Sequence, residues 1–408
     1  MSRPWPVLLA SLALGACHGT ADEVPPLTYG LEQPWSSRSA MPDIGDGLIV
    51  VTNSLDDTVS LLPLDSPGSP EWGELARVPV GLNPVELEGP HHAAFSPRGD
   101  FYYVGLSYYV PGGGSGPHGA HGTGTADGYC LKLDARTHRL VGSVRVDRNP
   151  GDLIASADGR TLYQTHFDLL KIADAARRGV TDEREMDARL AILDADTMTR
   201  KAMVPVCPAP HAVRLSPDET RAYVACLSDE VAVVPLNAEG HPVTRVKVAA
   251  NAGTALAPRH EPYALTVSPT DGAVWVSSLA SRTVHYLAPE TLTMVPERGV
   301  SLAGPPMFGA FSQDGSTLYM PYQQGEGLAV IDAATSQVVR DIPLAPSGCL
   351  NAHQVALTPD EQHGLVVCEG DHQGPGSLHV VDLAAGAVVR TVALGLFPDS
   401  VGILRRQP

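Results

Sequence analysis

The chain has 408 residues, of which 43% are hydrophobic and 18% are charged, so it can bury a large core and is not disordered as a whole. Its 40 glycines and 36 prolines favour many short strands joined by turns over a helical fold. A formal net charge of -17 excludes the basic surface that nonspecific nucleic-acid binding requires.

The first residues have the pattern of an export signal. Arg3 precedes a ten-residue apolar run over residues 7–16, which is too short to span a bilayer. The run ends in the sequence LGAC, which resembles a bacterial lipobox, so residues 1–16 are predicted to be a lipoprotein signal peptide and Cys17 to carry the lipid. The alternative is an ordinary signal peptide with a chance cysteine. The His18 that follows resembles the signal for the outer membrane of a Gram-negative bacterium.

A tether and an exported domain are predicted to follow. Residues 17–42 are rich in Pro and Ser and lack periodicity, which indicates a flexible linker. No later segment approaches eighteen uninterrupted apolar residues, so none is predicted to span a membrane. The chain is therefore expected to be extracytoplasmic, held to the membrane by its lipid anchor, in an oxidising compartment where disulfides persist.

A unit of four strands recurs through residues 43–408. In each unit an apolar strand leads into a turn resembling Ser-Pro-Asp-Gly, and a second apolar strand and then two more follow. The turns fall 44 to 60 residues apart, at Ser96, Ser156, Ser216, Ser268, Ser312 and Thr358. Four strands at this period are typical of a propeller blade. Because the turn recurs in most blades, Asp218 and Asp360 within it are predicted to be structural.

The two ends of the repeat region supply one further blade. Residues 47–62 contain a second and a third strand without a first, and residues 398–404 form a first strand with nothing after it. Pairing the two closes the ring and removes an exposed edge. The sequence therefore predicts an all-β, seven-bladed β-propeller, monomeric, with its first blade completed by the C-terminal strand.

The repeat resembles the YVTN-type β-propeller family. Degenerate copies of the motif occur at Val51-Thr52-Asn53, Tyr223-Val224-Ala225 and Trp275-Val276-Ser277. The resemblance covers about residues 44–404 and implies the fold. Members of such families serve as surface proteins, binding scaffolds, lactonases and subunits of redox complexes, so the resemblance leaves the function open.

One rim of the ring is predicted to form a ligand-facing mouth. The first strand of a blade begins, and the second ends, at the same rim. The residue five positions before each turn therefore lies near the start of an innermost strand, and this offset selects His91, Gly151, His211, Tyr263, Met307, His353 and Asp399. Alternation along a strand predicts that their immediate neighbours face blade packing instead.

Further residues are placed at the same mouth by the ends and loops of the strands. His166 ends a second strand, and His260 and Glu261 precede a first strand. His118 and His121 lie in a Gly-rich insertion, and His372 lies in another loop. Residues 169–186 have apolar positions at helical spacing, which predicts an inserted helix that caps this rim.

A metal site is one interpretation of these histidines. Neutral imidazole is a common ligand for Cu, Zn, Ni and Fe, so His91, His211 and His353 are the first-choice ligands of a metal or redox site, with copper as a candidate cofactor. The alternative is that the histidines serve packing and hydrogen bonding only, around a channel too wide for one ion to touch all three.

Four cysteines are predicted to form two equivalent disulfides. Cys207 and Cys226 are nineteen residues apart, as are Cys349 and Cys368, and both pairs have the same offsets from their turns. The alternative is a pair of metal sites that combine these thiolates with His211 and His353, which an oxidising compartment disfavours. Cys130 is left over and is predicted to be a buried, inert thiol.

The motifs exclude several enzyme classes, because the sequence contains no nucleophile elbow, Walker loop, zincin motif or dinucleotide fingerprint in the required context. The leading hypothesis is a lipid-anchored binding or scaffold module at the cell envelope, with an envelope protein or glycan as its partner. One alternative is a metal-binding redox protein or the propeller partner of a haem or copper enzyme. The other is a lactonase-like hydrolase in which Glu261, Asp399 and the mouth histidines act as acid–base groups.

Overall fold

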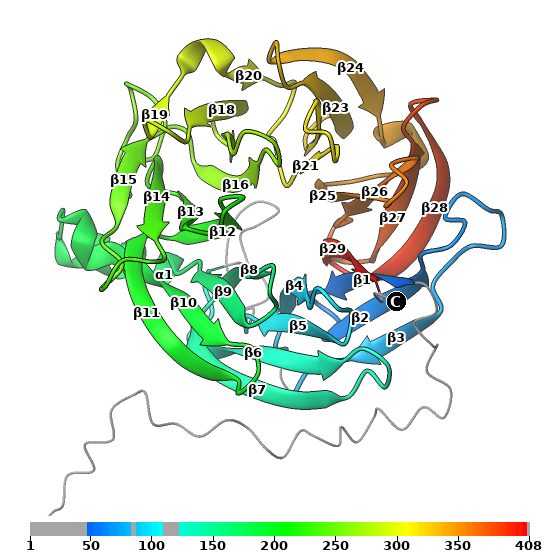
Figure 1. The fold of residues 1–408 in the computed structure, drawn as a ribbon, viewed down its shortest axis with the longest axis horizontal. Helices are drawn as coiled ribbons and strands as arrows, with labels where there is room; N and C mark the ends of the chain where they lie inside the picture. The colour runs from blue at the N-terminus through cyan, green and yellow to red at the C-terminus, as the bar shows by residue number, and fades with distance from the viewer. Residues whose placement is uncertain (1–46, 83–86, 109–121, 406–408) are drawn as a thin grey trace, which may run out of the picture.

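The computed structural model describes residues 47–82, 87–108 and 122–405. The predicted signal peptide and tether, with Cys17, lie outside these ranges, and so do His118 and His121. Within them the strands form seven sheets around a central axis (Figure 1). The prediction of a seven-bladed β-propeller is confirmed.

The blades are numbered one to seven in chain order, and their strands are given from the axis outwards. Blade one contains β29 (Pro398–Arg405), β1 (Gly47–Asn53), β2 (Thr58–Pro63) and β3 (Ala76–Pro79). Blade two contains β4 (Pro90–Phe95), β5 (Phe101–Leu106), β6 (Asp127–Asp134) and β7 (Leu140–Arg148). Blade three contains β8 (Pro150–Ala155), β9 (Thr161–His166), β10 (Asp187–Asp194) and β11 (Thr199–Pro208).

The other four blades follow the same order. Blade four contains β12 (Pro210–Leu215), β13 (Arg221–Cys226), β14 (Glu230–Pro235) and β15 (Thr244–Lys247). Blade five contains β16 (Pro262–Val267), β17 (Val274–Ser278), β18 (Thr283–Ala288) and β19 (Thr293–Met294), and β20 (Val300–Ser301) also pairs with β18. Blade six contains β21 (Ala310–Phe311), β22 (Thr317–Tyr322), β23 (Gly327–Asp332) and β24 (Gln337–Pro343). Blade seven contains β25 (Ala352–Leu357), β26 (His363–Cys368), β27 (Pro375–Asp382) and β28 (Ala387–Leu396).

The C-terminal strand closes the ring, as predicted. β29 pairs antiparallel with β1, so that Leu404 lies opposite Leu48 and Val401 lies opposite Val51. Leu48 and Leu404 belong to an apolar cluster with blade two, whereas Val51 and Val401 belong to a cluster with blade seven. Alternate side chains of one sheet thus pack against the sheets on either side, which explains the continuous apolar run in β1.

The predicted turns are held by side-chain hydrogen bonds. In blade four the Oγ of Ser216 accepts the N–H of Arg221 at 3.1 Å and donates to Asp218 at 2.6 Å. Asp218 in turn accepts the N–H of Thr220 at 3.1 Å. This aspartate therefore stabilises a turn.

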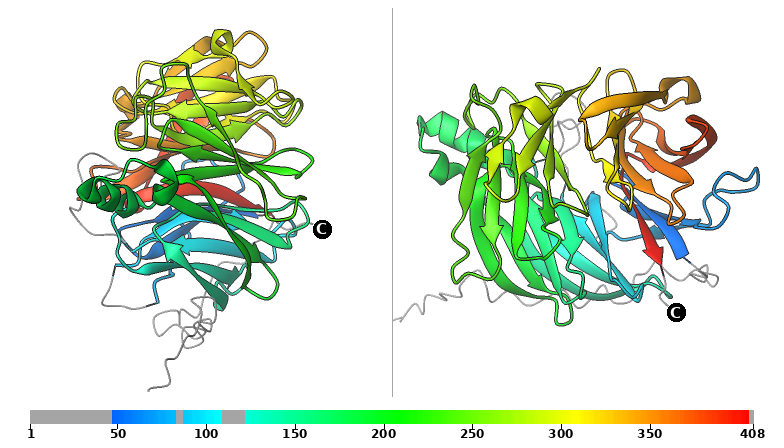
Figure 2. Two further views of the ribbon diagram at one scale, coloured as in Figure 1. Left: turned by 90° about the vertical axis from the view of Figure 1, so that its left-hand side faces the viewer. Right: turned by 45° about the horizontal axis from the view of Figure 1, so that its top comes forward.

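An inserted helix follows β9, as the periodicity predicts, but the α-helix is shorter than the predicted range of residues 169–186. Helix α1 (Leu169–Arg178) starts at the N-cap Asp168 and ends at Gly179, which has a φ of 69°. It lies at the outer edge of the ring (Figures 1 and 2). The described residues also include three short 3-10 helices, η3 (Glu183–Met186), η4 (Pro296–Arg298) and η5 (Ala345–Ser347). Within the described ranges, no helix has the length and apolar character needed to cross a membrane.

Both predicted disulfides are present, Cys207–Cys226 and Cys349–Cys368. They suit an oxidising, extracytoplasmic compartment. Their sulfur atoms are bonded to each other, so the alternative of thiolate metal sites does not hold. Cys130 is a buried free thiol, and burial raises its pKa, which leaves it unreactive in the folded chain.

Candidate functional site

Five side chains from the predicted mouth meet around the axis. The ring centres of His91 and His211 lie 5.3 Å apart, those of His211 and Tyr263 3.6 Å, and those of Tyr263 and His353 6.3 Å. Asp399 completes the circuit, because its Oδ1 lies 3.0 Å from Nδ1 of His353 and its Oδ2 lies 3.2 Å from Nε2 of His91. All five side chains are buried.

Each histidine of this circuit is anchored to the next blade. A backbone carbonyl can only accept, so the ring nitrogen that faces it carries the proton. The Nδ1···O distances are 3.0 Å from His91 to Pro150, 3.2 Å from His211 to Tyr263 and 2.6 Å from His353 to Asp399. The imidazoles thus connect neighbouring innermost strands, and their orientation is set by the closed ring.

His92 belongs to the same cluster, although alternation predicts that it faces blade packing. Its ring centre lies 4.5 Å from that of His91 and 5.8 Å from that of His211. The register between β4 and β5 shifts between Pro90 and Ala93, and such a bulge re-aims side chains. The prediction for His92 is therefore wrong. The signal in the sequence is the pair of adjacent histidines directly after the proline that begins the strand.

Asp152, a buried carboxylate of blade three, orients His92. Its Oδ1 lies 3.0 Å from Nδ1 of His92, and its Oδ2 accepts the N–H of Val213 at 3.0 Å and pairs with Arg214. Burial alone would raise the pKa of Asp152, but Arg214 and His92 outweigh it and hold the pKa well below its usual range. The ionised carboxylate can only accept, so the proton of His92 is on Nδ1. Its Nε2 is buried and has no hydrogen-bond partner in the described part of the chain.

Three of these imidazoles meet the distance requirement for a metal site. One ring nitrogen of each of His91, His92 and His211 lies within 4.8 Å of those of the other two. His353, the third member of the predicted trio, is not in this group, and its Nε2 lies 3.9 Å from Oε1 of Glu369. Phe308, which sequence reasoning did not single out, packs against His92 with a ring-centre distance of 4.8 Å.

A second acidic group lies beside His353. Burial and the nearby Glu326 raise the pKa of Glu369 well above its usual value. Gln323 donates to Glu369 at 3.3 Å, and Nε2 of His372 lies 2.8 Å from its Oε2. The structure therefore places the predicted loop residue His372 next to a buried carboxyl group.

His260 and Glu261 are held in a different environment. Both backbone N–H groups donate to Asp229 at 2.9 Å, and Nε2 of His260 lies 3.0 Å from the amide oxygen of Asn251. The ring of His260 packs on His285 at 5.2 Å. Burial and Asp229 raise the pKa of Glu261. These contacts anchor the segment that enters β16.

His166 lines a charged hollow of about 450 Å³ between blades two and three. Its Nδ1 donates to the carbonyl of Arg189 at 2.6 Å, and burial lowers its pKa. Two ion pairs lie in this hollow, Arg148 with Asp168 at 2.7 Å and Arg189 with Asp147 at 2.7 Å.

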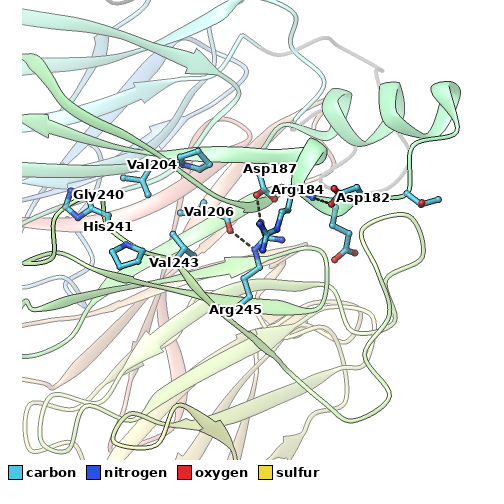
Figure 3. A pocket seen from close by; sticks show the side chains of 13 residues that line it. Asp182, Arg184, Asp187, Val204, Val206, Gly240, His241, Val243 and Arg245 are labelled. Carbon is cyan, nitrogen blue, oxygen red and sulfur yellow. Dashed lines mark hydrogen bonds and ion pairs between the residues drawn. The ribbon is translucent and has the colours of Figure 1, made fainter.

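A larger hollow of about 720 Å³ lies between β11 and β15 (Figure 3). Its central cation is Arg245, which pairs with Asp187 and donates to the carbonyl of Val206 at 2.9 Å. Glu230 lies 3.7 Å from the same guanidinium. Arg245 already has carboxylate partners, whereas Nε2 of His92 has no hydrogen-bond partner in the described part of the chain. The axial cluster is therefore the stronger candidate for a functional site.

The fold and this axis define a seven-bladed propeller with a histidine-rich centre. No protein-family model and no curated protein matches the sequence. Solved structures do match. A functionally unknown protein from Desulfotomaculum acetoxidans has a TM-score of 0.64 at 12% identity, over 88% of this chain and 99% of that one.

Two further structural neighbours have the names of enzymes. The periplasmic gluconolactonase PpgL of Pseudomonas aeruginosa has a TM-score of 0.60 at 18% identity, over 88% of this chain and 99% of that one. The dihydro-haem d1 dehydrogenase NirN has a TM-score of 0.51 at 18% identity, over 90% of this chain and 77% of that one. At such identities the likeness is one of fold.

Proposed function

We propose that this chain is an exported, lipid-anchored propeller that acts as a binding module at the cell envelope, with the axial cluster as its ligand site. The observation that carries the proposal is the convergence of His91, His92, His211 and His353 with the carboxylate of Asp399. Buried imidazoles and carboxylates cost free energy unless they are matched by partners. Nε2 of His92 is buried without a hydrogen-bond partner in the described part of the chain, and a ligand bound at the axis would supply that partner.

The proposed location, outside the cytoplasm and anchored to a membrane, rests on the N-terminal sequence and on the two disulfides. The apolar run that ends at Cys17 supports lipidation, and His18 supports an outer-membrane destination. The degenerate YVTN motifs support a place in that propeller family. Metabolic labelling with a radioactive fatty acid tests the anchor: the wild-type chain should be labelled and sediment with membranes, and Cys17→Ser should do neither. An unlabelled wild-type chain would contradict the anchor and leave the axial site unaffected.

Ligand binding is tested by thermal shift of the full chain against transition-metal ions, sugar acids, lactones and envelope glycans. A ligand of the axial cluster should raise the melting temperature of the wild-type chain and of His241→Gln, a histidine that lines the hollow of Figure 3. The shift should disappear in His92→Gln. A ligand that stabilises His92→Gln as strongly as the wild-type chain would contradict a site at the axis.

A lactonase-like hydrolase is the second candidate, and the pair formed by Asp152 and His92 favours it. A carboxylate-oriented imidazole is able to take a proton from water, and Arg214 beside it offers a cation for a developing oxyanion. Glu261, with its contacts to the Asp229 segment, is not part of this pair. Titration of the acid released from a panel of lactones tests the candidate. Activity lost in Asp152→Asn supports it, whereas rates equal to the uncatalysed reaction would contradict it.

A further inference from the structure

The ligand of the axial site follows from three properties of His91, His92 and His211. The first property is distance. A first-row metal ion with nitrogen bonds of about 2.0–2.1 Å holds two tetrahedral ligands about 3.3 Å apart. The ring nitrogens here lie within 4.8 Å of one another, so small rotations of the imidazoles bring them to that spacing.

The second property is the state of the rings. Nδ1 of His91 donates to the carbonyl of Pro150, Nδ1 of His211 to the carbonyl of Tyr263, and Nδ1 of His92 to the carboxylate of Asp152. Metal-binding histidines have this pattern, because a fixed acceptor on one nitrogen orients the ring and makes the other nitrogen a better ligand. In His92 this leaves Nε2, which is buried and has no hydrogen-bond partner in the described part of the chain, as the nitrogen for a ligand.

The third property is charge. The charge of Asp152 is matched by Arg214, while Asp399 places a second buried carboxylate 3.2 Å from Nε2 of His91. A dication beside the three nitrogens would bind Nε2 of His92 and lie close to the carboxylate of Asp399.

We infer that His91, His92 and His211 bind one first-row transition-metal ion, with Cu²⁺ preferred over Zn²⁺. The inference names the ligand of the binding site proposed above and rests on that proposal. Three neutral imidazoles suit borderline and softer cations, and the order of affinities favours Cu²⁺. Mg²⁺ and Ca²⁺, which take oxygen ligands, are excluded by the same donor set.

The test uses the full chain with a purification tag that contains no histidine. After removal of bound metal with a chelator, Cu²⁺ and Zn²⁺ are titrated in competition with a chromogenic chelator, and metal content is measured after dialysis. We expect one ion per chain, with Cu²⁺ held more tightly than Zn²⁺. Asp152→Asn should weaken Zn²⁺ binding by about 10- to 100-fold, and His92→Gln by about 100-fold or more.

The controls separate binding from folding and from other histidines. His241→Gln should bind as the wild-type chain does, and the circular-dichroism spectrum of metal-free His92→Gln should match the wild-type spectrum. With Cu²⁺, electron paramagnetic resonance should show nitrogen coupling that is reduced in His92→Gln. This signal reports the ligand directly and would not change if His92 were only structural.

Two outcomes would overturn the inference. One is a folded wild-type chain that retains no Cu²⁺ or Zn²⁺ after dialysis. The other is binding that is unchanged in both His92→Gln and His211→Gln. Either outcome would refute metal binding. The proposed binding function would still stand if an organic ligand raised the melting temperature of the wild-type chain but not that of His92→Gln. If no ligand depends on His92, both fail.

Discussion

Nδ1 of His92 lies 3.0 Å from Oδ1 of Asp152, although the two residues belong to neighbouring blades. Asp152 also accepts the N–H of Val213 in blade four. One buried carboxylate therefore joins the innermost strands of three consecutive blades. The orientation of the axial histidine therefore depends on how these three blades pack together.

Asp152→Asn should lower the free energy of unfolding at pH 7 by about 2–3 kcal/mol, because Arg214 loses its buried counter-charge. The lowered pKa of Asp152 also sets a pH dependence. A carboxylate with a lower pKa in the folded state stabilises the fold above its unfolded-state pKa of about 4, and this contribution disappears as the pH falls below that value. Urea unfolding at pH 7 and pH 3 measures both effects.

The variant should lose less stability than the wild-type chain between pH 7 and pH 3. Asp174→Asn is the matched control, because Asp174 pairs with Arg177 and Arg178 on the exposed face of α1. We expect its unfolding curves to overlay those of the wild-type chain. Equal pH dependence in Asp152→Asn and the wild-type chain would show that the buried ion pair is not formed.

Gly376→Ala should destabilise the ring closure. A Cβ at this position would lie 2.6 Å from the carbonyl oxygen of Cys368 and closer still to the ring of Pro398, which begins the closing strand. Both neighbours are rigid, so the strand must move, at a cost of about 1–3 kcal/mol. Thermal unfolding measures the loss.

Gly374→Ala is the matched control two residues earlier. Its Cβ would approach nothing nearer than Oδ1 of Asp371, at 3.7 Å, which is an ordinary contact. We expect its melting temperature to stay within about a degree of the wild-type value. If the two variants melt alike, the close approach of β27 to Pro398 is not a feature of the folded chain.

Removal of either disulfide should cost about 3 kcal/mol, because each closes a loop of nineteen residues. The double variants Cys207→Ala/Cys226→Ala and Cys349→Ala/Cys368→Ala, measured by urea unfolding, test this value. In the wild-type chain Cys130 should react with a thiol reagent only after denaturation. Modification of Cys207, Cys226, Cys349 or Cys368 in unreduced, denatured protein would contradict the pairing.

The fold could be predicted from the sequence because its repeat is strong. The turn residues at Ser216 and Thr358 recur at the period of a blade, and the unpaired strands at residues 47–62 and 398–404 fit only each other. The same offsets placed His91, His211 and Asp399 at the axis, because position in a repeat fixes position in the ring.

The remaining features of the site depend on local geometry that the repeat does not encode. Alternation predicts the wrong side of the strand for His92, because a bulge between Pro90 and Ala93 interrupts it. Asp152 and Arg214 have no motif of their own and come together only when blades three and four pack. The sequence predicts His260 at the same rim as the mouth residues, because it directly precedes a first strand. In the structure its side chain is hydrogen-bonded to Asn251 and packs on His285 instead of joining the axial cluster.

The metal site at the axis is tested by anomalous diffraction from crystals of the full chain soaked with Zn²⁺ or Cu²⁺. We expect one strong peak at the axis, about 2.0–2.1 Å from a ring nitrogen of each of His91, His92 and His211. A map without a peak at the axis, or with its only ordered ion beside other residues, would contradict it.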